Sequence, residues 1–97
     1  YNKIQALTTL DEALPLDNLS AKFKAFNWDC VEVSDGHSFD ELLPVFKESN
    51  TKGKPRVIIV HTIKGKGVKA FEHDPKWHAR RIKGKELEIG KKELGII

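Results

Sequence analysis

The sequence predicts an α/β fold with a parallel sheet and crossover helices. Residues 28–33 and 56–62 have strand-like composition, and the later segment is continuously apolar and β-branched, as buried parallel strands are. A helical apolar pattern precedes each of these segments. With a strand end at residues 1–5, the order is strand, helix, strand, helix, strand, which favours right-handed crossovers within one sheet. The length of 97 residues allows at most one compact domain.

The first predicted helix follows residues 1–5, where Tyr and Ile suit a strand and Asn suits the turn after it. Pro15 fits the first helical turn, and Asp17 favours the positive end of the helix. The helix is expected to end near Asn27, because asparagine tolerates a left-handed conformation. The apolar stripe that should face a sheet consists of Leu16, Leu19, Phe23 and Phe26.

The second predicted helix begins at Ser38, after a strand at 28–33 and a turn with Asp35-Gly36 chemistry. Ser38 and Glu41 have the spacing of a capping box, in which each side chain satisfies a backbone N–H of the other. Pro44 should kink this helix or keep it short, because it removes a backbone hydrogen bond. The expected apolar stripe is Phe39, Leu42, Leu43 and Phe46.

The last predicted strand, 56–62, leads into Lys64-Gly65-Lys66-Gly67, and residues 68–84 show no periodicity. Residues 85–97 are expected to form a short helix that Gly90 breaks and that ends at Gly95. Ligands of parallel sheets bind at the carboxyl ends of the strands. The Lys-Gly-Lys-Gly segment is therefore a candidate phosphate contact, although a solvated basic turn is an equal alternative.

The charge is unevenly distributed along the chain. Residues 1–51 hold four lysines against nine acids, whereas residues 52–97 hold thirteen lysines and arginines against five acids. The basic half favours an anionic partner or a solvated surface, and no nucleic-acid-binding motif accompanies it. A single cysteine excludes an internal disulfide framework and favours a cytoplasmic setting. No apolar run is long enough for a membrane helix, and no signal peptide is expected.

An ordered set of short motifs resembles the transketolase family, in the later part of its diphosphate-binding domain. Each motif alone is weak, and their order across residues 1–82 carries the resemblance; residues 83–97 are expected to be a helical tail. Deoxyxylulose-phosphate synthases share some motifs, but Val68 is more typical of transketolases. The motifs are Asn2-Lys3-Ile4-Gln5, Lys22-Phe23-Lys24-Ala25-Phe26-Asn27-Trp28, Asp35-Gly36-His37, His61-Thr62-Ile63-Lys64-Gly65-Lys66-Gly67-Val68 and Trp77-His78.

The resemblance implies a thiamine diphosphate cofactor held through Mg²⁺. By position in the motifs, the Asn2 side chain and the Ile4 carbonyl match metal ligands, and oxygen donors suit this hard ion. Lys64 matches a lysine at the edge of the cofactor site. His78 matches a histidine that faces the diphosphate and the reacting substrate, where it could act as a catalytic acid or base. Arg80, where relatives often carry lysine, is the expected substrate-phosphate contact.

The resemblance also implies an incomplete enzyme that transfers a two-carbon ketol unit between a ketose phosphate and an aldose phosphate. The expected partners are the remainder of the transketolase, which includes an upstream Gly-Asp-Gly segment and a pyrimidine-binding domain, in a homo- or hetero-oligomer. Two alternatives remain: a synthase that decarboxylates a keto acid, and a non-catalytic basic module that binds phosphorylated ligands. Four residues depart from the family pattern: Ser34, Pro44, Ala79 and Arg80.

Overall fold

A computed structural model describes residues 1–48 and 53–96, which form two compact units. The first unit contains Tyr1 and Leu16–Thr62, and the second contains Asn2–Pro15 and Ile63–Ile97. Part of the predicted polar loop at 50–55 lies outside the described residues. Each unit is described by itself below.

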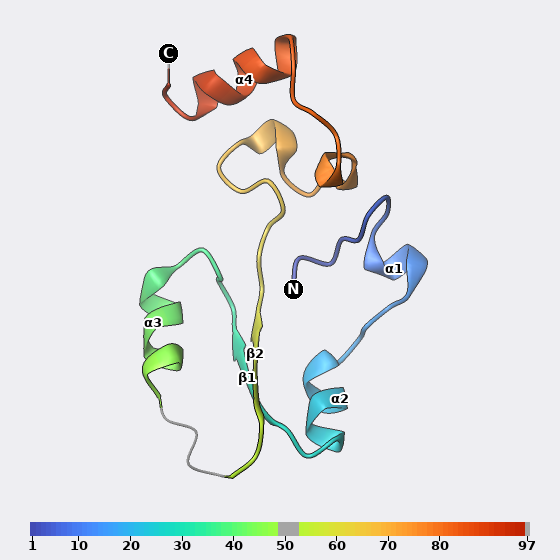
Figure 1. Ribbon diagram of the computed structural model, residues 1–97, viewed down its shortest axis with the longest axis vertical. Helices are drawn as coiled ribbons and strands as arrows, with labels where there is room; N and C mark the ends of the chain where they lie inside the picture. The colour runs from blue at the N-terminus through green and yellow to red at the C-terminus, as the bar shows by residue number, and fades with distance from the viewer. Residues whose placement is uncertain (49–52, 97) are drawn as a thin grey trace. The chain divides into compact units, whose positions relative to one another are not determined.

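The first unit is built on a parallel pair of strands, β1 (Asp29–Val33) and β2 (Arg56–Val60). In the register, Asp29 lies opposite Arg56 and Val33 lies opposite Val60. Helix α2 (Leu19–Ala25) precedes β1, and helix α3 (Phe39–Lys47) connects β1 to β2; Figure 1 shows these helices on opposite sides of the strands. The predicted α/β fold with a parallel sheet is confirmed.

Tyr1 extends this sheet beyond β2, on the edge opposite β1. Its amino group donates to the Val60 carbonyl at 2.6 Å, and its carbonyl accepts from the Thr62 N–H at 3.2 Å. The His61 N–H between them donates instead to Val33 of β1 at 3.0 Å. Because successive N–H groups of a strand point to opposite edges, β2 lies between β1 and Tyr1. The expected strand end at residues 1–5 is therefore limited to the backbone of Tyr1.

The two strands begin at a cross-strand ion pair. Arg56 Nε lies 2.7 Å from Asp29 Oδ2, and the two side chains are only 13% and 9% exposed. Arg56 Nη1 also donates to the Glu48 carbonyl, at the end of α3, at 3.0 Å. Buried charges are retained when they are paired in this way, so the pair ties the strand register to the preceding helix.

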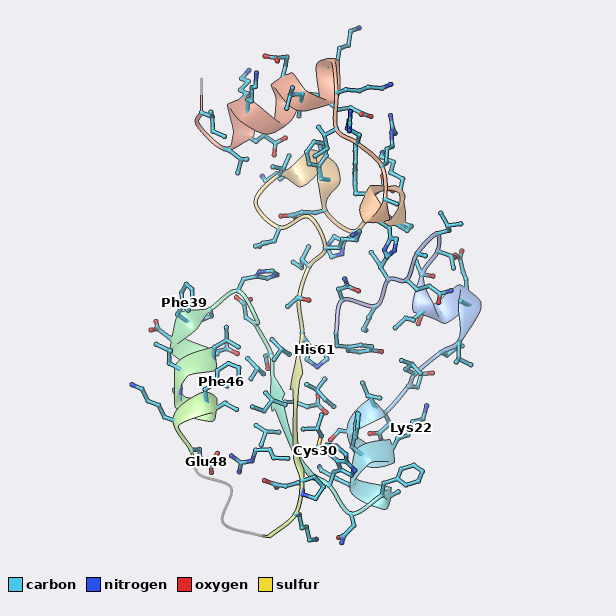
Figure 2. The ribbon with its side chains drawn as sticks, in the orientation of Figure 1. Lys22, Cys30, Phe39, Phe46, Glu48 and His61 are labelled. Atoms are coloured by element: carbon cyan, nitrogen blue, oxygen red, sulfur yellow. The ribbon has the colours of Figure 1, made fainter. Side chains whose placement is uncertain are left out.

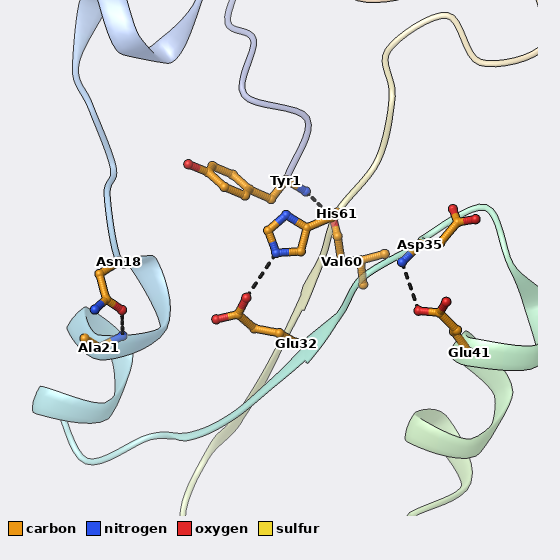
Figure 3. Close-up of polar contacts among 8 residues, drawn as sticks. All are labelled: Tyr1, Asn18, Ala21, Glu32, Asp35, Glu41, Val60 and His61. Atoms are coloured by element: carbon orange, nitrogen blue, oxygen red, sulfur yellow. Dashed lines mark hydrogen bonds and ion pairs between the residues drawn. The ribbon is translucent and has the colours of Figure 1, made fainter.

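Helix α2 begins later than its sequence pattern predicts. Asn18, with φ 52° and ψ 52°, is the N-cap, and its side chain accepts from the Ala21 N–H at 3.0 Å (Figure 3). Pro15 and Asp17 consequently lie before the helix, and Phe26 is 81% exposed rather than part of a buried stripe. Asn27 has φ 66°, which confirms the expected left-handed residue after the helix.

Helix α3 forms where it was predicted, but the capping box was wrong. Ser38 makes no side-chain capping bond, and Glu41 accepts from the Asp35 N–H at 2.9 Å instead (Figure 3). The helix continues through Pro44 to Lys47, although proline cannot donate to the carbonyl four residues earlier. The labelled side chains of Phe39 and Phe46 in Figure 2 are 74% and 64% exposed. Only part of the predicted stripe therefore packs in this unit.

Gly36 allows the turn after β1 to lie against the end of β2. A Cβ at this position would lie 2.3 Å from Val60 Cγ1 and 2.8 Å from the His61 carbonyl, to which the Gly36 N–H donates at 2.7 Å. We expect Gly36→Ala to lower the free energy of unfolding by about 1–3 kcal/mol, as inserted core methyl groups do. Chemical denaturation of the complete protein measures this loss. The matched control is Ser34→Ala on the same turn; equal effects of both changes would contradict the account.

The second unit contains four short helices: α1 (Leu10–Ala13), the 3₁₀ helices η1 (Lys69–Phe71) and η2 (Pro75–His78), and α4 (Lys85–Glu93). The expected break at Gly90 was wrong, because α4 continues through this residue. Gly90 is buried, and a Cβ there would lie 3.2 Å from Phe71 Cε2, so its lack of a side chain lets α4 approach η1. Gly95, with φ 65°, follows the end of the helix.

None of the helices in residues 1–48 and 53–96 has the length and apolar character needed to cross a membrane.

Candidate functional site

The predicted metal ligands Asn2 and Ile4 lie in one tight turn. Asn2 Oδ1 accepts from the Ile4 N–H at 2.9 Å, and Lys3 between them adopts a left-handed conformation with φ 59°. An antiparallel bridge pairs Ile4 with Thr9 through bonds that start at Gln5 and Leu10, so it does not use the Ile4 carbonyl. The turn thus holds an amide oxygen beside the Ile4 peptide, an arrangement that can supply oxygen ligands to a hard cation.

The Lys64–Gly67 segment forms two successive turns, and residues 61–63 separate it from the end of β2 at Val60. The Lys66 N–H donates to the Ile63 carbonyl and the Val68 N–H to the Gly65 carbonyl, each at 3.2 Å. Gly65 and Gly67 have φ values of 77° and 103°, which side chains other than glycine rarely adopt. A Cβ at Gly65 would lie 2.4 Å from the Phe71 carbonyl. The glycines therefore permit this compact turn.

This turn is connected to the loop that carries His78. The Lys64 carbonyl accepts from the His73 N–H at 3.0 Å, and the Gly67 N–H donates to Glu72 Oε1 at 3.3 Å. His73 is itself left-handed, with φ 60°. The half-buried Lys64 and the start of the next loop therefore form one local cluster, whereas Asn2 and Ile4 form another.

His78 is the last residue of η2, and it is exposed. Asp74 caps this helix by accepting from the Lys76 N–H at 3.0 Å, and its Oδ2 lies 2.6 Å from Lys76 Nζ. The hydrogen bonds from the Lys76 side chain and backbone lower the pKa of Asp74. The cap thus fixes the start of the short helix that presents His78.

Arg80 lies two residues after η2 and contacts Trp77 and Glu86. Its guanidinium carbon is 5.2 Å from the centre of the Trp77 ring, and its Nη2 lies 2.9 Å from Glu86 Oε1. Trp77 packs against Phe71 with a ring separation of 4.4 Å. The Trp77 indole N–H is buried, and it has no hydrogen-bond partner within the described part of the chain. Arg80 itself is 48% exposed, which leaves its guanidinium accessible to an anion.

A polar contact at the end of β2 was missed by the sequence analysis. His61 Nε2 lies 3.1 Å from Glu32 Oε2 of β1, and the His61 ring meets Tyr1 edge-on at 5.5 Å (Figure 3). The hydrogen bond from His61, with a further one from Ser20, lowers the pKa of Glu32. Glu32 lies in β1 and His61 directly follows β2, so the pairing of these two parallel strands brings the two side chains together.

The described residues offer oxygen donors in one cluster and cations in another. No group of three or more His, Cys, Asp or Glu side chains capable of holding a metal occurs in 1–48 or 53–96. A metal at Asn2 and Ile4 would instead use an amide and a carbonyl oxygen, with other ligands supplied from elsewhere. Together with the turns after a parallel strand, these groups suit a phosphate-containing ligand and its hard cation.

In open parallel α/β sheets, ligands bind outside the carboxyl ends of the strands. Residues 2–97 match the family model described as the thiamine diphosphate binding domain of transketolase. The chain belongs to the transketolase family, whose members are transferases, and it forms part of their thiamine diphosphate-binding domain.

Individual relatives agree with this assignment. The chain is 35% identical over 79% of its length to an apulose-4-phosphate transketolase subunit of Phocaeicola vulgatus. It is 40% identical over 74% of its length to the 6-deoxy-6-sulfo-D-fructose transketolase subunit of a Clostridium species. It is also 38% identical over 73% of its length to the 1-deoxy-D-xylulose-5-phosphate synthase of Chlorobaculum tepidum. The chain covers 27%, 26% and 11% of these three proteins, so it spans only a fraction of each relative.

Proposed function

We propose that the complete protein containing this chain transfers a two-carbon ketol unit from a ketose phosphate to an aldose phosphate. The observation that carries the proposal is the match of residues 2–97 to the transketolase domain, together with identities of 35% and 40% to two proteins named as transketolase subunits. Thiamine diphosphate, when bound, supplies the carbanion chemistry that breaks and forms the bond beside the ketose carbonyl. The residues of this chain are proposed to bind and orient the cofactor and the substrate and to exchange protons with the substrate.

Asn2 and Ile4 are proposed as ligands of a Mg²⁺ ion that accompanies the diphosphate. The turn supports this role because Asn2 Oδ1 is already fixed beside the Ile4 peptide, at 2.9 Å from its nitrogen. An amide oxygen has a further lone pair after accepting one hydrogen bond, so it can also bind a cation. Mg²⁺ demands octahedral geometry and usually completes it with phosphate oxygens and water.

Lys64 and His78 are proposed to act at the diphosphate and at the reacting substrate, respectively. Lys64 follows the β2 segment in a turn held by two left-handed glycines, which suits a fixed cation near phosphate oxygens. His78 stands exposed at the end of a capped 3₁₀ helix. Its imidazole can donate to a developing oxyanion or carry a proton near neutral pH. Arg80, beside it, is proposed to contact the substrate phosphate, as guanidinium groups do.

The remaining partners are proposed from the size and names of the relatives. Two of them are named as subunits, and the chain spans about a quarter of each. We propose that further protein, in the same or another chain, supplies the missing metal ligand and the pyrimidine end of the site, in a homo- or hetero-oligomer. A cytoplasmic location is proposed from the single cysteine alone.

The isolated 97-residue chain is expected to be poorly stable and catalytically silent, even with thiamine diphosphate and Mg²⁺. Its apolar side chains Phe26, Phe39 and Phe46 remain 81%, 74% and 64% exposed. Because this apolar surface stays in contact with water, it does not stabilise the folded chain. Circular dichroism during urea titration and a ketol-transfer assay measure both properties, with the complete protein as control. Robust turnover by the isolated chain would contradict this expectation.

A keto-acid-decarboxylating synthase is the second candidate, because the Chlorobaculum relative is named as a synthase rather than a transketolase. The two candidates differ in their donor. The complete enzyme should be incubated with an aldose phosphate and either a ketose phosphate or pyruvate. We expect turnover with the ketose phosphate and no release of carbon dioxide from pyruvate. The reverse pattern would favour the synthase.

A further inference from the structure

A ring of contacts in the second unit connects α4 to the segment that carries His78 and Arg80. Gly90 of α4 lies against the Phe71 ring, and Phe71 packs on Trp77 at 4.4 Å between ring centres. Trp77 in turn lies 5.2 Å from the Arg80 guanidinium. Arg80 Nη2 then reaches Glu86 of α4 at 2.9 Å, which closes the ring.

The two α4 residues of this ring share one helix face. Glu86 and Gly90 are four residues apart, a spacing that places them one above the other on an α-helix. The Gly90 contact with Phe71 is apolar and requires the absence of a side chain at residue 90, whereas the Glu86 contact with Arg80 is an ion pair. A second link between α4 and η1, from the Lys69 N–H to Glu93 Oε2 at 2.5 Å, holds the same elements together. These contacts hold α4 against η1, so the α4 residue that pairs with Arg80 has a fixed position.

We infer that Glu86 is a positioning residue, which with the Trp77 ring orients the Arg80 guanidinium toward a substrate phosphate. This inference rests on the proposed function of Arg80. The aromatic face and the carboxylate restrict a long side chain that would otherwise sample many rotamers. The carboxylate uses one edge of the planar guanidinium and leaves its other N–H groups for a phosphate. In this inference Glu86 does not contact the substrate and acts only through Arg80.

The test uses the complete enzyme and a phosphorylated ketose donor. We expect Glu86→Ala to raise KM for that donor about three- to fivefold, the size that a partly exposed ion pair supports, while kcat stays nearly unchanged. Glu86→Gln should lie between wild type and Glu86→Ala, because its amide oxygen still accepts a hydrogen bond from Arg80. KM for a ketose without phosphate should not change in either variant.

Glu88→Ala is the matched control. It removes the same charge from the same helix, but Glu88 pairs with Lys91 at 3.2 Å rather than with Arg80. Trp77 is not substituted, because it also packs against Phe71. The thermal midpoint of unfolding of each variant separates loss of folding from loss of positioning. If Glu86→Ala is destabilised, the kinetics of Glu86→Gln are used for the comparison instead.

A double-mutant comparison decides between positioning and a general structural role. In an Arg80→Ala background, Glu86→Ala should cause no further rise in KM, because its effect passes through the missing guanidinium. If Arg80→Ala raises KM but Glu86→Ala behaves like Glu88→Ala, the inference is overturned and the proposed function stands. If Arg80→Ala itself leaves KM unchanged, the phosphate role of Arg80 fails, and the inference fails with it.

Discussion

His78→Ala is expected to lower kcat/KM of the complete enzyme by about 100-fold or more, in the range of a lost acid–base or oxyanion contact. The reason is the proposed position of the imidazole at the reacting centre, on a helix whose start is fixed by the Asp74 cap. If His78 only occupies a solvated surface, the same change should leave kinetics unaltered and shift stability by less than about 0.5 kcal/mol. Steady-state kinetics with a ketose phosphate donor distinguishes these cases.

The neighbouring lysines provide the comparison for His78. Lys64→Ala should mainly weaken binding of cofactor or substrate, because a point charge near phosphate acts in the ground state and in the transition state alike. Lys66→Ala and Lys69→Ala change the same charge at nearby exposed positions and should be close to neutral. Small and equal effects in all four variants would identify a charged surface rather than an active site.

Asn2→Ala is expected to weaken joint binding of Mg²⁺ and thiamine diphosphate by about 10–100-fold, by analogy with losses around other metal sites. The substitution removes the side-chain oxygen that the turn holds beside the Ile4 peptide. Cofactor titration of the complete protein at several Mg²⁺ concentrations measures the change.

Two further variants separate metal binding from the shape of the turn. Asn2→Asp keeps an oxygen for both the Ile4 N–H and the cation, so it should retain most of the affinity. Gln5→Ala changes an exposed neighbour on the same segment and should behave as wild type. An unchanged titration for Asn2→Ala would contradict the assignment of Asn2 as a ligand.

The fold was predictable where local patterns and tertiary packing agree. The apolar, β-branched composition of 56–62 indicated a strand, which forms over Arg56–Val60, and Asn27 indicated the end of the preceding helix. The expected burial of the whole strand was wrong, because only Ile59 of its five residues is buried. The start of α2 was not predictable from Pro15 and Asp17, because the left-handed Asn18 provides a competing cap. Gly90 was interpreted as a helix breaker because glycine has a low helix propensity. Its contact with Phe71 outweighs the free-energy cost of placing glycine inside a helix.

The candidate site depends on a different kind of information. The glycines at 65 and 67 were interpreted as a candidate phosphate contact or a basic turn, and the structure shows a turn in which both have positive φ values. The roles of Asn2, Ile4, Lys64, His78 and Arg80 come from resemblance to the family and stay predictions. The pairs Glu32–His61 and Arg80–Glu86 could not be predicted, because spacing along the chain does not reveal which side chains meet across elements.

The fate of the two transferred carbons tests the central claim most directly. A ketose phosphate donor, isotopically labelled at its first two carbons, should be incubated with the complete enzyme, an unlabelled aldose phosphate, thiamine diphosphate and Mg²⁺. The account predicts that both labelled carbons appear together in a new ketose phosphate, and that transfer stops when the cofactor is withheld. Label that remains in the donor under these conditions, with the protein folded and the cofactor bound, would contradict it.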